Sequence, residues 1–116
     1  MDLIGDTDLI TRLMSATTLR AKVLAGNISN QNTPGYQRHD VDFENLLRQA
    51  LETGSSVREV RPEVTVDTVT PAGPDGNNVV LEVELNAARE NRLLFEAYAT
   101  ILQGKLGLIE QSIASR

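Results

Sequence analysis

The sequence predicts a mainly α-helical fold in which two long terminal helices pair as a coiled coil. Apolar residues recur at alternating spacings of four and three residues near both ends of the 116-residue chain. Only 3% of the residues are aromatic, so the core must consist of aliphatic stripes. The middle is richer in Val, Thr, Pro and Gly. We therefore expect three segments: an N-terminal helix and turn (1–36), a short helix plus an extended stretch (37–77), and a C-terminal helix (78–116).

The C-terminal segment has the longer apolar pattern. It predicts one helix from about Asn78 to the C-terminus, with Asn77 or Asn78 as its N-cap and a length of roughly 50 Å at 1.5 Å per residue. Arg92 is the single interruption of the stripe. The assembly seam that we predict on this helix consists of Leu81, Leu85, Phe95, Leu102, Leu106, Ile109 and Ile113.

The N-terminal segment has a matching stripe, so the two helices should pair in parallel or antiparallel. Its seam residues are Ile10, Met14, Leu24 and Ile28. Further apolar residues of the last helix, such as Leu93 and Leu108, lie off the seam and exceed what two helices can bury in each other. Either the middle segment folds back over them or another molecule covers them.

Between the helices the patterns are shorter. A short amphipathic helix is expected, capped by Asp40 or Asp42 and closed by Gly54. The stretch VREVRPEVTVDTVT is rich in Val and Thr, but Pro62 restricts it to an edge strand or an extended segment. PAGPDGNN then predicts a turn. The apolar face of the short helix would contain Phe43, Leu46, Leu47, Ala50 and Leu51.

The stretch NISNQNTPGYQRHDVDF after the first helix has more polar detail than a helix end requires. Pro34 suits the second position of a type I or II turn, and Gly35 suits the third position, where type II needs a positive φ. Asn30 or Asn32 could end the helix in the left-handed conformation. The Asn27 amide could tie the turn to the helix, and Tyr36 could cover it. The predicted junction motif is Asn27, Asn30, Asn32, Thr33, Pro34, Gly35 and Tyr36.

Composition argues against several classes of protein. The net charge of −5 lacks the basic footprint of a nucleic-acid binder, and no apolar run reaches the roughly 20 residues of a membrane span. The acidic N-terminus is unlike a cleaved signal peptide. His39, Asp40 and Asp42 are the candidates for a catalytic or metal site, but no second His and no Cys could complete it. We therefore predict no enzyme activity, no cofactor and no metal.

Two blocks of sequence resemble a known family. They are LRAKVLAGNISNQNTPGYQRHDVDFENLL and DGNNVVLEVELNAARENRLLFEAYATILQGKLGLIEQSI. Together they are similar to the rod and hook family of bacterial flagellar axial proteins. That resemblance implies that the terminal helices form a coiled-coil layer of a tubular assembly, and that the subunit is exported unfolded by the flagellar type III apparatus. It also implies a structural protein without catalysis.

Within this family, the Asp75-Gly76-Asn77-Asn78-Val79 start of the last helix, without a larger inserted domain, favours a proximal rod subunit that self-assembles through its terminal helices and transmits torque. The implied partners are copies of itself, other rod and basal-body proteins, and the export apparatus. The implied location is the periplasmic rod of the basal body, reached without a cleaved signal peptide. Phe43 and Leu47 resemble an export-gate docking element, but the same pair could simply pack the short helix. The alternatives are another proximal rod protein of this family and a soluble coiled-coil adaptor or export chaperone.

Overall fold

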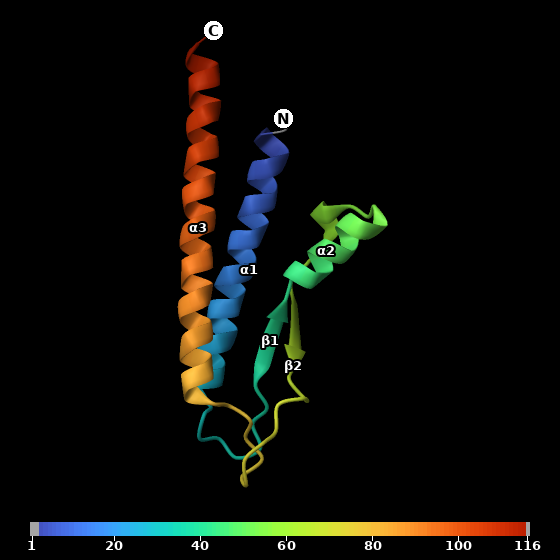
Figure 1. Cartoon of the computed structure of the whole chain (residues 1–116), viewed down its shortest axis with the longest axis vertical. Helices are drawn as coiled ribbons and strands as arrows, with labels where there is room; N and C mark the ends of the chain where they lie inside the picture. Colours follow the sequence, from blue (N-terminus) through green and yellow to red (C-terminus); the bar gives the residue numbers. More distant parts are fainter. Residues whose placement is uncertain (1–2, 116) are drawn as a thin grey trace.

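The computed structural model describes residues 3–115, so residues 1, 2 and 116, including Asp2 of the acidic N-terminus, lie outside it. The molecule is elongated, with extents of 66 × 29 × 14 Å. Two long helices, α1 (Leu3–Ser29) and α3 (Leu81–Ala114), lie side by side, and the middle segment lies against α1 (Figure 1). This arrangement confirms the predicted mainly helical fold with paired terminal helices.

The two long helices run antiparallel. Near one end of the pair, Lys105 Nζ lies 3.3 Å from Asp6 Oδ2, and at the other end Asn27 Nδ2 donates to Glu84 Oε2 at 3.0 Å. The 34 residues of α3 extend beyond the first described turn of α1 (Figure 1). At 1.5 Å per residue this helix is roughly 51 Å long, as the sequence predicted.

The predicted start of α3 is wrong by about three residues. The helix begins at Leu81, and Val80 occupies the N-cap position in an extended conformation without a side-chain capping bond. Asn77 and Asn78 are buried in the preceding loop, where their side-chain amides bond carbonyl groups of other loops. Their side-chain oxygens are used as well, because Asn77 Oδ1 accepts from the Val79 amide and Asn78 Oδ1 accepts from the Arg38 amide, so neither caps the helix.

The middle segment contains a two-stranded antiparallel sheet. Strand β1 (His39–Asp42) pairs with β2 (Glu63–Val66), with His39 opposite Val66 and Asp42 opposite Glu63. Strand β2 starts directly after Pro62, as expected for an extended edge segment. Strand β1 packs on α1 and buries Val41, and the sequence analysis did not predict it.

The short helix α2 (Glu44–Thr53) ends at Gly54, whose φ of 74° confirms the predicted left-handed end. Its predicted caps are wrong, because Phe43 occupies the N-cap position and makes no side-chain capping bond. Asp40 and Asp42 instead pair with β2 through their backbone. A short 3-10 helix, η1 (Val57–Glu59), connects α2 to β2.

The middle segment leaves much of α3 uncovered. It packs on α1, where Ile10, Ala16, Leu24 and Phe43 form the small buried core. Of the two outcomes left open by the sequence, the structure therefore contradicts the one in which the middle covers the excess apolar surface. Exposed large apolar side chains of α3 are Val83, Leu85, Leu93, Leu94, Phe95, Ile101, Leu106, Leu108 and Ile113.

Candidate functional site

Two tight turns meet below the helix pair. In the first, the Tyr36 amide donates to the Thr33 carbonyl at 3.2 Å and Gly35 has a φ of 75°, which matches the predicted type II turn. In the second, the Gly76 amide donates to the Gly73 carbonyl at 2.9 Å. The Gly35 amide then donates to the Asp75 carbonyl at 2.9 Å, so the two turns bond each other. These two loops are among the most distant parts of the molecule from the chain ends (Figure 1).

Helix α1 ends without a left-handed asparagine. Among the described residues no non-glycine residue has a positive φ, so the expected conformation of Asn30 or Asn32 is wrong. Asn30 instead donates its side-chain amide to the Gly26 carbonyl at 2.8 Å, satisfying one carbonyl of the last turn. The Asn77 amide from the second turn donates at 2.8 Å to the carbonyls of both Asn30 and Thr33.

Asn27 joins three elements through one buried amide. Its Nδ2 donates to the His39 carbonyl at 2.9 Å and to Glu84 Oε2 at 3.0 Å. Its Oδ1 accepts from the His39 amide at 2.9 Å and from the Tyr36 hydroxyl at 3.4 Å. Asn27 therefore ties α1 to β1 and α3, in addition to the turn that the sequence assigned to it.

Arg38 gathers carboxylates from three parts of the chain, and we name Arg38, Asp40, Asp67 and Glu84 the Arg38 cluster. Arg38 Nε lies 2.5 Å from Glu84 Oε1, and Nη1 lies 2.8 Å from Asp40 Oδ2 and 3.0 Å from Asp67 Oδ2. Glu84 is fully buried. The hydrogen bond to Glu84, supported by those to Asp40 and Asp67, raises the pKa of Arg38, so the guanidinium stays charged at every working pH.

Asp67 closes the cluster after β2. The Thr70 hydroxyl donates to it at 2.6 Å, and the amides of Thr70 and Val69 donate at 3.0 and 2.9 Å. These bonds, with that from Arg38, hold the pKa of Asp67 well below its usual range. Asn78 attaches the loop before α3 to the cluster, because its Oδ1 accepts from the Arg38 amide at 2.7 Å and its Nδ2 donates to the Asp67 carbonyl at 2.9 Å.

Four polar residues spaced by seven lie on the face of α3 that meets α1, and we name Glu84, Asn91, Tyr98 and Lys105 the polar row. Asn91 Nδ2 donates to the Thr17 carbonyl at 2.8 Å, and its Oδ1 accepts from Arg20 at 3.3 Å. Burial raises the pKa of Tyr98. The sequence analysis missed this row because it followed apolar residues; the seven-residue spacing of the polar ones was the available signal.

The predicted seam residues fall into two groups. Those toward the partner helix are buried or half-buried: Ile10, Met14, Leu24, Ile28, Leu81, Leu102 and Ile109. The others are 39 to 66% exposed: Leu85, Phe95, Leu106 and Ile113. Arg92, the break in the stripe, is also exposed and pairs with Glu96 at 3.2 Å. Helix α3 thus has two sets of apolar residues. One set packs against α1, and the other is exposed to solvent.

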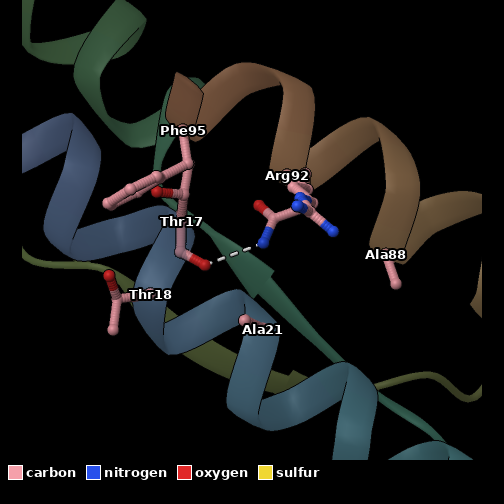
Figure 2. Close-up of a pocket in the computed structure, with 7 residues that line it drawn as sticks. Thr17, Thr18, Ala21, Ala88, Arg92 and Phe95 are labelled. Carbon is pink, nitrogen blue, oxygen red and sulfur yellow. Dashed lines mark hydrogen bonds between the residues drawn. The ribbon is translucent and has the colours of Figure 1, made fainter. Parts of the chain in front are cut away.

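A groove of about 320 Å³ lies between α1 and α3 beside this exposed surface. Thr17, Thr18 and Ala21 approach it from α1, and Ala88, Arg92 and Phe95 approach it from α3 (Figure 2). Its lining is mainly methyl and ring carbon, with the Arg92 side chain on the rim. The groove therefore suits an apolar side chain accompanied by a negative charge.

Phe43 and Leu47 differ in exposure. Phe43 is 1% exposed and lies near Thr11 and Ser15 of α1, whereas Leu47 is half-buried on α2. The two sit four residues apart, and the Leu47 amide donates to the Phe43 carbonyl at 2.8 Å. In the folded chain Phe43 is therefore a packing residue.

Two of the three candidate catalytic or metal-binding side chains, His39 and Asp40, have structural partners. The His39 ring lies 5.7 Å from the Tyr36 ring, and Asp40 pairs with Arg38. Across residues 3–115, no group of three or more His, Cys, Asp or Glu side chains is placed to hold a metal ion. In the same range, the helices are too short or too polar to cross a membrane.

Comparison with known proteins finds relatives of one kind. The flagellar basal body rod protein FlgB of Aquifex aeolicus (strain VF5) is 30% identical over 122 residues, covering 100% of this chain and 98% of the relative. The FlgB proteins of Borrelia hermsii and Bacillus subtilis (strain 168) are 27% and 22% identical, over 81% and 91% of this chain and 84% and 91% of their own lengths. No protein-family model matches the chain.

The long helix pair, the turn motifs and these relatives define a flagellar basal-body rod protein, a structural component of the bacterial flagellum. Because the Aquifex relative is 30% identical along the whole chain, the chain belongs to the FlgB family.

Proposed function

We propose that this chain is a structural subunit of the proximal rod that self-assembles through its terminal helices and transmits torque. The observation that carries the proposal is the exposed apolar side of α3, where Leu85, Phe95, Leu106 and Ile113 face solvent although α3 already has α1 as its partner. Apolar surface of this extent on a small chain supports burial against other subunits. Membership of the FlgB family supports the same role.

The proposal extends to location, partners and segment roles. The rod would lie in the periplasmic space, and the subunit would reach it through the flagellar export apparatus without a cleaved signal peptide. Neighbours would be other rod and basal-body proteins and copies of this chain. Segments 1–36 and 78–116 would form the axial layer, and segment 37–77 would stand beside it. We propose a structural role alone, without catalysis.

The experiment compares two charges introduced on α3. Leu106→Asp places a carboxylate on the exposed seam and should abolish motility and incorporation into basal bodies, because a buried unpaired charge costs several kcal/mol. Thr100→Asp is the matched control, since Thr100 is exposed on the polar back of α3 and bonds only within its own helix. Leu102→Asp and Ile109→Asp should also block assembly, but they lie toward α1 and test the subunit fold as well.

Normal incorporation of Leu106→Asp would contradict assembly through this surface. The rival function is a soluble adaptor or chaperone, and hydrogen exchange separates the two. A rod subunit should show weak amide protection across residues 5–30 and 80–113 when dilute and strong protection once assembled. Strong protection in the dilute monomer would favour the adaptor.

A further inference from the structure

Helix α3 has two different apolar flanks, one on each side of the face that contacts α1. Successive residues of an α-helix are about 100° apart, so residues spaced by seven form nearly straight rows. On α3, two mainly apolar rows lie on either side of the polar row, and we name them flank A and flank B. Flank A is Leu85, Arg92, Ala99, Leu106 and Ile113, and flank B is Ala87, Leu94, Ile101 and Leu108.

Both flanks are open in the subunit. Leu85 and Leu106 of flank A are 39 and 47% exposed, and Ile101 and Leu108 of flank B are 48 and 52% exposed. The middle segment is held on α1 instead, through strand β1 and through the pair between Glu44 of α2 and Arg20 of α1. The groove in Figure 2 belongs to the side of flank A, where Arg92 and Phe95 line it.

The flanks also differ in charge. Arg92 stands on flank A with an 82% exposed side chain at the rim of the groove, where its Nε lies 3.2 Å from Glu96 Oε1 in an exposed ion pair within the helix. Glu90 is exposed and lies four residues before Leu94, one turn away on the side of flank B. Arg92 and Glu90 lie at nearly the same level along the helix axis. Flank A and flank B are therefore complementary in charge as well as apolar. Because the guanidinium has five N–H donors and its pair with Glu96 is exposed, Arg92 can also donate to a second carboxylate from a neighbouring copy.

We propose that flank A of one copy binds flank B of a second copy in the same orientation, with Leu94 of the second copy in the Thr18–Phe95 groove and its Glu90 beside Arg92. Contacts between two unlike surfaces of one subunit repeat from copy to copy and build open helical arrays, whereas a self-complementary surface closes a dimer. This contact rests on the proposed rod function and specifies how neighbouring copies meet.

Disulfide trapping tests the contact, because the natural chain contains no cysteine. Thr18→Cys marks the groove and Leu94→Cys marks flank B. Cells that lack their own copy of the gene would carry either variant, both variants together, or the double variant, and basal bodies would be oxidised and separated on non-reducing gels. We expect no dimer from either single variant, a dimer from the pair, and a ladder of dimers, trimers and longer products from the double variant.

Dimers from a single variant would show a self-complementary contact and overturn the proposal. Basal bodies that contain both variants but form no dimer would overturn it too, while leaving the rod function intact. Absence of the natural chain from basal bodies would instead overturn the rod function itself.

A charge exchange provides an independent test. Arg92→Glu alone and Glu90→Arg alone should each reduce incorporation by on the order of tenfold, since facing like charges disfavour a contact by at least about 1.4 kcal/mol. The variant with both changes should recover to within about twofold of the natural chain. Failure of the double exchange to recover, with both single variants impaired, would show that the two charges do not face each other.

Discussion

Asn27 and Glu84, 57 residues apart in the sequence, meet side chain to side chain at 3.0 Å in a fully buried contact. Each also holds a further element: Asn27 bonds the backbone of His39, and Glu84 pairs with Arg38. The contact therefore couples the end of the first helix to the first turn of the last helix and to the strand between them. Stability of the subunit should depend on this point more than on any single apolar residue of the exposed flanks.

Asn27→Asp should destabilise the subunit by at least about 3 kcal/mol. The change removes the donor to His39 and Glu84 and sets two carboxylates against each other in a buried site. Urea unfolding followed by circular dichroism, at a protein concentration at which the natural chain is folded, measures the effect. Asn32→Asp is the matched control, because Asn32 is exposed in the turn that follows α1 and the variant should stay within about 0.5 kcal/mol of the natural chain. Equal stability of the two variants would contradict the central role of Asn27.

Arg38→Met should cost about 3–5 kcal/mol, because it leaves the buried Glu84 carboxylate without its cation. Arg38→Lys should recover only part of the loss, since an ammonium cannot reproduce the guanidinium fork that reaches several carboxylates. Arg48→Met, an exposed cation on α2, serves as the control. An Arg38→Met midpoint close to that of Arg48→Met would show that the Arg38 cluster contributes little.

Low pH should destabilise the subunit by protonating Asp67 of the Arg38 cluster. Because its pKa is lowered in the folded chain, its contribution is fully present above the ordinary value of 3.8 and is lost as the pH falls from there toward the lowered pKa. Urea midpoints of the natural chain and of Asp67→Asn should therefore differ at pH 7 and converge below roughly pH 4. A difference that stays constant over this range would exclude the titration of Asp67 as its cause.

Two glycine-to-alanine changes should act in opposite directions. Gly76 has a φ of 83°, and a Cβ there would lie 3.3 Å from Gly35 Cα, so Gly76→Ala should destabilise by about 1–2 kcal/mol. Gly104 lies within α3 with open space around it, so Gly104→Ala should stabilise by about 0.5–1 kcal/mol. Thermal unfolding of the two variants measures both. Stabilisation by Gly76→Ala would contradict the close contact of the two turns.

Phe43→Ala separates packing from export. If Phe43 acts only by packing under α1, the variant should be exported at the natural level but be incorporated poorly, with a stability loss of about 3–5 kcal/mol. If Phe43 and Leu47 also dock the unfolded chain on the export gate, the variant should remain in the cytoplasm. Fractionation of cells that carry Phe43→Ala decides between the two. Leu51→Ala, an exposed aliphatic change on α2, is the control.

Periodicity predicted the two long helices and their pairing because apolar spacing is set locally, within one or two turns. The Pro-Gly turn and the Gly54 helix end were also predictable, since each depends on one residue's φ. The roles of Asn77 and Asp40 were not. Both residues suit helix caps, but Asn77 bonds the Asn30 carbonyl, 47 residues away, and Asp40 lies in β1, where its carboxylate pairs with Arg38. Strand β1 was missed because only its pairing with β2, more than twenty residues later, makes it extended.

The polar row has a consequence for the geometry of repeated subunits. If α3 slid along α1 by one heptad, Glu84, Asn91 and Lys105 would lose their present partners, which are Asn27, the Thr17 carbonyl and Asp6, so slippage breaks three polar contacts at once. The length by which α3 projects past α1 is then identical in every copy. A row of aliphatic residues would bury more apolar area but would tolerate slippage. The polar row thus acts as a molecular gauge that gives each subunit the same axial dimension, which a regular lattice requires.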